Sequence, residues 1–417
     1  MLRFFRYKKP NGRVLFALLD ENHFPGVERT LFIHSLNIKA TNSVENLVYD
    51  LRFLLNLAEC YNISIERCVK VLMKHELLAF CRLYIEACKF EYMGAIEFIS
   101  NRSAPGKIVK RNISNKALHN LIFAPVRYKT VSNITRNRRI HIAVRYIEFL
   151  TSQLTEFDFP EIPFRSILEL LNQSKTRSRK SSVKSFQFQS VLPESVNDNL
   201  KEIIHPLHPN NPFKTSRLRN YLIISILLWG GIRRSACMKL RIGDFDFTGD
   251  CNIVYITRTP DSKDDPRIRP PAQKTREHIM VLPTFLMVEI KNYHSEIRTK
   301  YPYSNSHEFI FVTEKAGLHP AGYPLATNTV NKIFKVLSSA LKHHVHPHIL
   351  RYQWNITFDA ICEQASISGD EKDSIRKEAM GWSRDSTMPQ LYNRINIIKE
   401  MQRALKWHHE VIHNVNQ

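Results

Sequence analysis

The chain has 417 residues, 43% of them hydrophobic, so it is too long for one typical core and apolar enough to be globular. Its 60 Lys and Arg against 39 Asp and Glu give a net charge of +21, which favours a polyanion, above all nucleic acid, as partner. A basic surface that is merely solvated is the alternative interpretation. We therefore expect two or three globular domains that bind nucleic acid.

Three features argue against a membrane, secreted or zinc-binding protein. The longest apolar run, from Tyr221 to Trp229, lies between Arg219 and Arg233 and is far shorter than the roughly 20 residues that span a bilayer. It predicts a buried helix. Residues 1–6 lead into no apolar core of a signal peptide, so we expect the chain not to be secreted. The cysteines are odd in number and form no CxxC pair, which predicts reduced thiols in a cytosol. They stand at positions 60, 68, 81, 88, 237, 251 and 362.

The N-terminal part of the chain predicts a hairpin followed by helices. Pro10-Asn11-Gly12 separates two short apolar stretches and predicts a hairpin turn. A helix is expected from Asn42, which forms a cap-like pair with Glu45. Its apolar residues recur at helical spacing at Val44, Leu47, Val48, Leu51 and Leu55. Further helices are expected through about residue 99.

Basic residues in this half of the chain are candidates for contacts with DNA phosphates. The polar stretch 102–116 contributes Lys107, Lys110 and Arg111. A later helix has an apolar face made of Ile140, Val144, Ile147 and Leu150. The arginines expected on its remaining surface are Arg136, Arg138, Arg139 and Arg145, of which the first three are candidates for DNA contacts. A solvated charged face is an equally good interpretation for any one of them.

The amphipathic pattern breaks between residues 156 and 186, where a Ser-rich basic run covers 174–182. We expect an interdomain linker that can follow a DNA backbone, with a plain flexible spacer as the alternative. Its candidate DNA-binding residues are Lys175, Arg177, Arg179 and Lys180. Beyond residue 192, strands are expected at 253–257, 278–282 and 309–312, and helices at 284–300, 329–342 and 394–413.

Two arginines in the second half stand where they can meet in a cleft. The segment from Gly230 to Asp244 begins with two glycines, which free the backbone so that Arg233 can leave the buried helix. The second, Arg351, stands three residues after His348 in a segment that opens with Pro347. Two planar guanidinium groups can hold the non-bridging oxygens of a phosphodiester.

An aromatic segment completes this constellation. Met380-Gly381-Trp382 is followed by Tyr392, ten residues after the tryptophan. Cutting a phosphodiester without a metal needs cations on the phosphate oxygens, an acid for the leaving oxygen and a phenol as nucleophile. All three kinds of group are present, so the sequence predicts a site that cuts DNA.

In order and approximate spacing, these segments resemble the boxes of the tyrosine recombinases, the phage integrase family. Residues 230–244 resemble the family's TGLRxSEL box with its following Leu and Asp, residues 348–351 its HxLR box, and residues 380–382 its LGH or GW box. The family's catalytic lysine, in a β-hairpin turn, fits Lys274, with Lys263 as the competitor. The resemblance covers roughly residues 25–405.

The resemblance implies a mainly α fold with a small β-sheet. A helical, SAM-like core-binding domain precedes a mixed α/β catalytic domain in this family. The domains expected here are an N-terminal extension at 1–24, the core-binding domain at 25–155, the linker at 156–186, the catalytic domain at 187–405 and a tail at 406–417.

It also implies a site-specific recombinase that cleaves and rejoins DNA strands through a 3′-phosphotyrosyl intermediate, as the integrase or transposase of a mobile element. The expected partners are double-stranded DNA attachment sites, further copies of the chain in a homotetramer on DNA, and an accessory directionality factor. No metal or other cofactor and no membrane are expected. The expected location is the bacterial cytoplasm, on the DNA.

Each catalytic position then has an expected role. The two box arginines, Arg233 and Arg351, stabilise the pentacoordinate transition state. Lys274 protonates the departing 5′ oxygen. The remaining three form the nucleophile and its surroundings. His348 accepts or shares the proton of Tyr392, and Trp382 donates its indole N–H to a phosphate oxygen.

Two departures from the family pattern leave rival functions open. The acidic residue usual three places after the first arginine is Ala236, and the residue after the second, often His, is Tyr352. A type IB topoisomerase uses the same chemistry as a monomer, but the core-binding pattern and the Gly-Trp box favour a recombinase. A catalytically silent DNA-binding protein on this fold has Ala236 as its best support.

The histidines within 343–348 invite a zinc interpretation, but neighbouring histidines in an irregular segment point apart.

Overall fold

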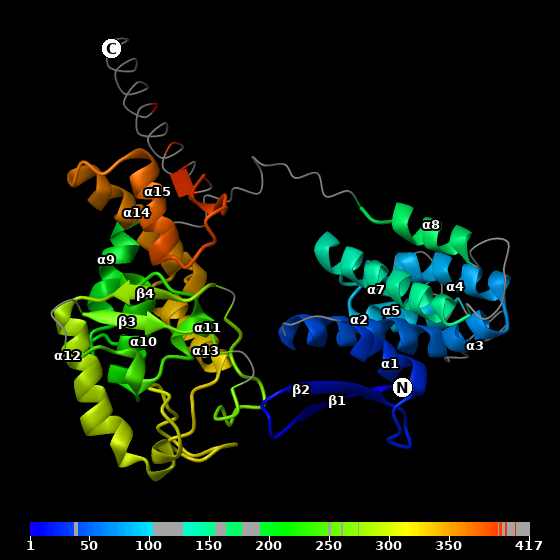
Figure 1. Cartoon of the computed structure of the whole chain (residues 1–417), viewed down its shortest axis with the longest axis horizontal. Coiled ribbons are helices and arrows are strands. Elements are labelled where there is room, and N and C mark those ends of the chain that lie inside the picture. Colours follow the sequence, from blue (N-terminus) through cyan, green and yellow to red (C-terminus); the bar gives the residue numbers. More distant parts are fainter. Residues whose placement is uncertain are drawn as a thin grey trace, which may run out of the picture. The chain divides into compact units, whose positions relative to one another are not determined.

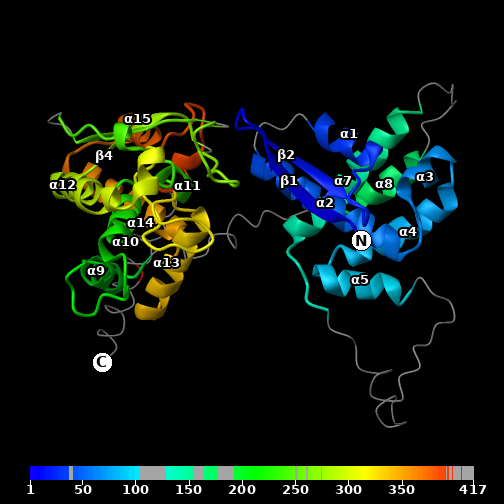
Figure 2. The same cartoon turned by 90° about the horizontal axis from the view of Figure 1, so that it is seen from below.

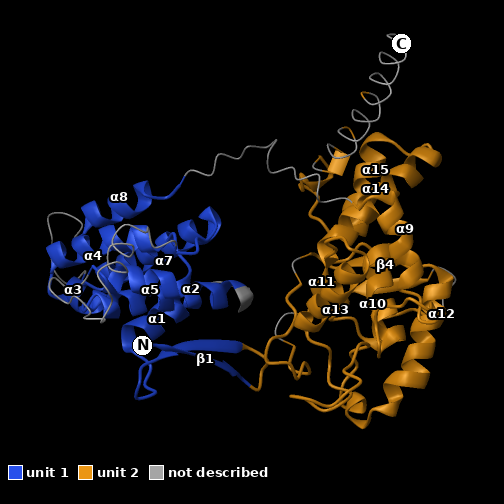
Figure 3. Ribbon diagram, turned by 180° about the vertical axis from the view of Figure 1, so that it is seen from behind, with its two compact units in different colours: residues 1–9, 14–182 blue, residues 10–13, 183–417 orange. Residues whose placement is uncertain are grey.

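The structure is a computed structural model that describes residues 1–36, 41–102, 128–154, 164–176, 192–248, 252–259, 262–273, 275–390, 392–393, 397 and 405. It divides into two compact units, residues 1–9 with 14–182 and residues 10–13 with 183–417 (Figure 3). Within the described ranges the chain is mainly helical, and its named strands form two-stranded antiparallel sheets. The expected fold class is therefore confirmed.

The first unit begins with a β-hairpin that covers a bundle of helices. Its elements are β1 (Arg3–Lys8), β2 (Val14–Leu19), α1 (Val27–Ser35), α2 (Thr41–Cys60), α3 (Ile65–Lys70), α4 (Lys74–Ala87), α5 (Tyr92–Ser100), α7 (Asn133–Ser152) and α8 (Arg165–Gln173). The predicted hairpin turn is confirmed, with Lys8 opposite Val14 in the register and Gly12 at φ +85°. Alternate residues of β2 are buried against the helices, so the hairpin belongs to the core of this unit.

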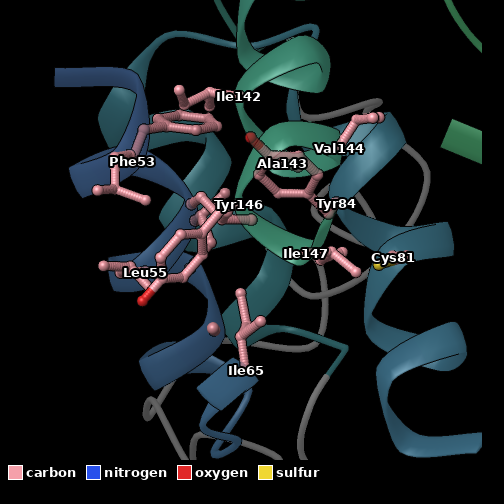
Figure 4. Close-up of a cluster of buried hydrophobic side chains, with 14 of the residues drawn as sticks. Phe53, Leu55, Ile65, Cys81, Tyr84, Ile142, Ala143, Val144, Tyr146 and Ile147 are labelled. Carbon is pink, nitrogen blue, oxygen red and sulfur yellow. The ribbon is translucent and has the colours of Figure 1, made fainter. Parts of the chain in front are cut away.

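The core of the first unit lies between α2 and α7, which run side by side (Figures 1 and 2). The predicted apolar face of α2 is confirmed, and Val48 and Leu51 are fully buried on it. The helix begins at Thr41, so Asn42 lies in its first turn rather than at its N-cap. Figure 4 shows Tyr84 and Tyr146 gathered with aliphatic side chains in this cluster.

The arginines of α7 are mostly internal, so the expectation of an exposed basic face is wrong for Arg136 and Arg139. These two side chains are 7% and 8% exposed. Arg139 donates to the carbonyl oxygens of Cys88 and Phe90 at 3.3 and 2.7 Å. Arg138 is more exposed but forms an ion pair with Asp50. The physical reason is that α7 packs against α1, α2, α3 and α8, so its buried face is wide and takes in long side chains.

A helix also lies inside the segment that was predicted to be a linker. α8 buries Ile167 and Leu171 against the bundle. Asn137 of α7 holds Thr176 beyond it, with its side chain donating to the Thr176 carbonyl at 2.8 Å and accepting from the Thr176 N–H at 3.0 Å. The half-buried Lys175 donates to Asn172. The remaining candidates of this basic run, Arg177, Arg179 and Lys180, lie outside the described residues, as do Lys107, Lys110 and Arg111.

The second unit places helices around the buried helix α10. Its elements are α9 (Glu194–Ile203), α10 (Arg217–Trp229), α11 (Arg234–Cys237), β3 (Ile253–Ile256), β4 (His278–Val281), α12 (Thr284–Asn292), α13 (Thr327–Ala340), α14 (Pro347–Gln364) and α15 (Gly369–Ala379). Short 3₁₀ segments cover Ile242–Asp244, Arg298–Lys300 and Pro302–Ser306, and a π-helical turn covers Tyr293–Ile297. Residues 222–228 of the apolar run in α10 are buried, as predicted, while Trp229 at its end is exposed.

The predicted strands at 253–257 and 278–282 are confirmed as the antiparallel pair β3 and β4. The predicted strand at 309–312 is wrong. Phe309 forms an isolated bridge with Arg241 and Val312 one with Pro324, so the two ends of this buried segment pair with different neighbours. An apolar run alone cannot distinguish such a segment from a strand. The six cysteines within the described ranges are free, and no described helix is long and apolar enough to cross a bilayer.

Candidate active site

The first arginine of the site is delivered by a tight turn after α10. Gly231 has φ +59°, in the left-handed region that favours glycine. A Cβ atom there would lie 2.6 Å from the Trp354 ring, so a side chain is also excluded by space. Arg233 follows at the N-cap of α11, half-buried, with one of its terminal nitrogens (Nη1) buried and making no hydrogen bond. The predicted role of the glycine pair as a turn is thus confirmed at Gly231.

The second arginine joins the three sequence boxes. Arg351 lies in the second turn of α14 and is 2% exposed. It donates to the carbonyl oxygens of Gly231 at 2.6 Å and Met380 at 3.1 Å. Its guanidinium carbon lies 5.6 Å from the centre of a Trp382 ring. One side chain therefore contacts segments that are more than a hundred residues apart in the sequence.

The tyrosine predicted to be the nucleophile is enclosed by aromatic rings. Tyr392 is 2% exposed. It stacks on Trp382 at 5.4 Å with an interplanar angle of 16°, and Tyr352 lies 5.3 Å away. Tyr352 in turn contacts the ring of His348 edge-on at 4.9 Å. The structure therefore brings five of the six predicted catalytic residues together, and Lys274 lies outside the described residues.

Burial and positive charge set the ionisation of this cluster. Burial raises the pKa of Tyr392, and the charges of Arg351 and Arg233 act in the opposite direction. Burial and the charge of Arg233 lower the pKa of Arg351 to about 10, so this guanidinium stays charged at pH 7. Burial and the charges of Arg351, His346 and Arg233 lower the pKa of His348. At neutral pH the site thus holds a neutral phenol, a neutral imidazole and two cations.

Several donors of the cluster have no acceptor. Three polar groups of the cluster are buried and form no hydrogen bond of good geometry within the described residues: the Trp382 indole nitrogen, the Tyr392 hydroxyl and the Arg233 Nη1. Arg351 nevertheless lies close enough to Tyr392 to lower its pKa. Buried donors are normally satisfied, so such a set favours an anionic ligand with several acceptor oxygens.

A pocket of about 420 Å³ opens beside the two arginines. Its lining residues are Ile232, Arg233, Arg234, Ser235, Asn331, His346, Pro347, His348 and Arg351. A cavity of about 430 Å³ in the first unit has acidic as well as basic walls, including Asp20, Glu59 and Glu66. We take the first pocket as the candidate active site, because the charged side chains in its lining are all arginines and two of them, Arg233 and Arg351, lie close enough to lower the pKa of Tyr392.

Two residues that bind the third box were missed by sequence reasoning. Arg276 donates from its backbone N–H to Gly381 O at 3.1 Å and from Nε to Trp382 O at 2.7 Å, and it pairs with Glu378. The ring of His278 lies against Gly381, where an added Cβ would be 2.4 Å from Nδ1. The start of β4, which follows Lys274 closely, is therefore fixed to the Gly-Trp segment. The alternating burial pattern of β4 indicates that His278 is buried, but it does not indicate which residues the ring contacts.

The competing lysine lies in a different setting. Lys263 is exposed, and among the described residues no contact joins it to either box arginine. Its segment is anchored by the buried pair of Asp265 and Arg267, which are 2.8 Å apart. Arg267 also donates to the carbonyl oxygens of Met238 and Leu325 at 2.8 Å each. Lys274 itself lies outside the described residues, so its assignment as the catalytic lysine stays a prediction.

The histidine-rich segment shows no metal-binding geometry where it is described. His344 and His346 lie 5.4 Å apart between ring centres. Within the ranges described above, no group of three or more His, Cys, Asp or Glu is arranged to hold a metal ion.

Comparison with known proteins identifies the family of the second unit. The model of the phage integrase family matches residues 196–397, a range that contains all six predicted catalytic residues. Residues 196–397 belong to this family, the tyrosine recombinases. The resemblance seen in the three boxes is therefore confirmed.

The relatives and solved structures that resemble this chain are distant in sequence. The type 1 fimbriae regulatory protein FimB of Escherichia coli K12 is 27% identical over 136 residues, which are 32% of this chain. The match spans 56% of FimB, little more than half its length. A XerH site-specific recombinase in a post-cleavage complex with its difH substrate is 16% identical, with 89% of this chain and 98% of that chain covered and a TM-score of 0.48. A Tn1549 transposon integrase in complex with transposon right-end DNA is 15% identical, covering 66% and 80%, with a TM-score of 0.37.

Proposed function

We propose that this chain is a site-specific DNA recombinase that cuts and rejoins strands through a 3′-phosphotyrosyl intermediate, as the integrase or transposase of a mobile element. The observation that carries the proposal is the convergence of Arg233, Arg351 and Tyr392 around buried donors that have no acceptor. Cations and N–H donors placed there match the oxygens of a phosphodiester, and the phenol supplies the nucleophile.

The cleavage step follows from these positions. The Tyr392 hydroxyl oxygen attacks phosphorus and passes its proton to His348. The bond from phosphorus to the 5′ oxygen breaks, and Lys274 gives a proton to that oxygen. The box arginines and the Trp382 indole N–H hold the non-bridging oxygens while negative charge develops. One phosphodiester replaces another, so the reverse attack by a 5′ hydroxyl rejoins a strand without an external energy source.

The partners of the proposed reaction are double-stranded attachment sites and further copies of the chain, acting as a tetramer on two duplexes. The net charge of +21 supports binding to the phosphate backbone. A directionality factor and a bacterial, DNA-associated location belong to the same proposal. The best support for the alternative, a catalytically silent DNA-binding protein, is still Ala236, a buried core residue at the position where the family has a carboxylate.

One assay separates the three functions. The full chain is incubated in EDTA with supercoiled plasmids that carry a library of random inserts, and protein–DNA adducts are trapped with denaturant. A recombinase is expected to give adducts at selected inserts, and joined products when two such inserts share a plasmid. A topoisomerase would relax every plasmid without recombinants. DNA binding with neither adducts nor relaxation would identify a catalytically silent DNA-binding protein.

The pH dependence of the cleavage rate is expected to reflect the protonation state of His348. Its imidazole must be neutral to accept the phenol proton, so activity is present above its pKa and is lost as pH falls through it. That pKa is lowered from the usual 6.5 by burial and by Arg351, His346 and Arg233. The rate of adduct formation at low DNA concentration should therefore be level at neutral pH, with its acid limb below pH 6.5.

His348→Ala provides the control for this assignment. Without the acceptor, the rate should fall by roughly 10²-fold or more and rise with pH into the alkaline range, because the pKa of Tyr392 is raised. A variant that keeps the wild-type acid limb would place the proton acceptor elsewhere.

A further inference from the structure

The residue after the proposed nucleophile is held by a completely buried arginine. Arg376, on α15, has no exposed surface. Its Nη1 donates to the side-chain oxygen of Asn393 at 3.0 Å, and its Nη2 forms an ion pair with Asp359. Asn393 directly follows Tyr392 in the chain. Arg376 therefore connects the side chain of the residue after the nucleophile to the interior of the second unit.

The other end of this connection is the helix that carries the catalytic arginine. Asp359 is 3% exposed and lies on α14, eight residues after Arg351, which is about two helical turns. Lys372 also contacts it, at 2.6 Å. Asp359, Arg376 and Asn393 thus form a chain of polar contacts from α14 through α15 to the nucleophile segment, which we name the α14–α15 latch.

The latch does a different task from the rings around Tyr392. Trp382 stacks on the phenol ring and Tyr352 lies against it at an angle of 49°, and these ring contacts are less directional than a hydrogen bond. A directed hydrogen bond to the next residue restrains that remaining freedom. A buried ion pair contributes little net stability compared with apolar residues of the same volume. A directional donor fixed in the interior is what such an arginine supplies and an apolar residue does not.

We propose that Arg376 and Asn393 are positioning residues that hold the Tyr392 oxygen in line with the phosphate bound by Arg233 and Arg351. This inference rests on the proposed function and deepens it. The competing explanation is that the latch only stabilises the second unit. The two explanations differ in which step the loss of the contact slows.

Asn393→Ala removes the nucleophile end of the latch without opening the core, since this side chain is half-buried. We expect the single-turnover rate of adduct formation at saturating DNA to fall by about 10- to 100-fold, because misplacement of about 1 Å has effects of that size. The dissociation constant for the selected plasmid insert should stay within about twofold, since Asn393 is not among the residues that line the phosphate pocket. A cleavage rate equal to wild type would overturn the proposal.

Two matched variants separate positioning from stability. Lys372→Met weakens the ion-pair network at Asp359 without touching Asn393, so it should lower the melting temperature and leave the single-turnover rate nearly unchanged. The Asn393→Asp, Asp373→Asn double variant exchanges a carboxylate and an amide that are 3.4 Å apart and keeps an acceptor facing Arg376. It should recover most of the rate lost in Asn393→Ala. Rates that track melting temperature across all three variants would show a merely structural role.

A sulfur-substituted substrate gives a further readout. A duplex with sulfur at the bridging 5′ position of the cleaved bond needs no proton on the leaving group. Asn393→Ala should remain slow on this substrate, since its defect lies in the approach of the nucleophile. Full recovery would contradict the positioning role.

If the wild-type chain forms no adduct with any plasmid insert, the proposed function fails, and with it the premise of the latch. Normal wild-type cleavage with a normal Asn393→Ala rate would reject the latch alone.

Discussion

Tyr392→Phe is expected to abolish covalent adducts with DNA, a loss on the order of 10⁴-fold or more in cleavage rate, while DNA binding stays within a few-fold. The change removes one oxygen atom, and that oxygen is the nucleophile. It should leave the fold intact, because the Tyr392 hydroxyl is buried without a satisfactory hydrogen bond. Removing such a group costs little stability. The measurements are adduct yield on denaturing gels, DNA affinity and melting temperature.

Tyr352→Phe is the matched control for this prediction. Its ring contacts the rings of both Tyr392 and His348, so it is an alternative phenol within the same cluster. It should keep adduct formation, because its ring contacts survive the change. Adducts that persist in Tyr392→Phe and vanish in Tyr352→Phe would make Tyr352 the nucleophile.

Lys274→Ala is expected to cut normal DNA roughly 10²- to 10⁴-fold more slowly and to recover on a substrate whose bridging 5′ oxygen is sulfur. A thiolate leaves without a proton, so an acid is no longer needed. Tyr392→Phe should not recover on that substrate. The prediction is motivated by the place of Lys274 just before Arg276, which donates hydrogen bonds to the carbonyl oxygens of Gly381 and Trp382.

Lys263→Ala completes this experiment. Lys263 is exposed, and its segment is anchored by Asp265 and Arg267, so its loss should leave cleavage of normal DNA nearly unchanged. If Lys263→Ala, and not Lys274→Ala, recovers its cleavage rate on the sulfur-substituted substrate, Lys263 is the general acid. Rescue of neither variant would reject a lysine as the acid.

The parts of the fold that the sequence predicts well are those set by local pattern. The turn at Pro10-Asn11-Gly12, the apolar face of α2 and the buried run in α10 each follow from residues close together in the chain. The order of the three boxes likewise predicts that Arg233, Arg351 and Trp382 meet, and Arg351 contacts the other two segments.

The parts that local pattern misses depend on contacts between distant residues. α8 is short and lies next to a Ser-rich run, and the docking of Asn137 onto Thr176 cannot be read from either neighbourhood. Arg139 looks like a surface residue by composition, yet α7 is packed by four other helices. In the site, the contacts of Arg276 with Gly381 and of Arg376 with Asn393 have no periodic signal at all.

The most direct test of the proposed chemistry is to locate the covalent bond. Adducts trapped in EDTA are digested with nuclease and protease, and the nucleotide-bearing peptide is sequenced by mass spectrometry. We expect a nucleotide attached through its 3′ phosphate to Tyr392, with a free 5′ hydroxyl on the released strand. A nucleotide on another residue, a 5′-phosphate linkage, or cutting that leaves no adduct and stops in EDTA would contradict it.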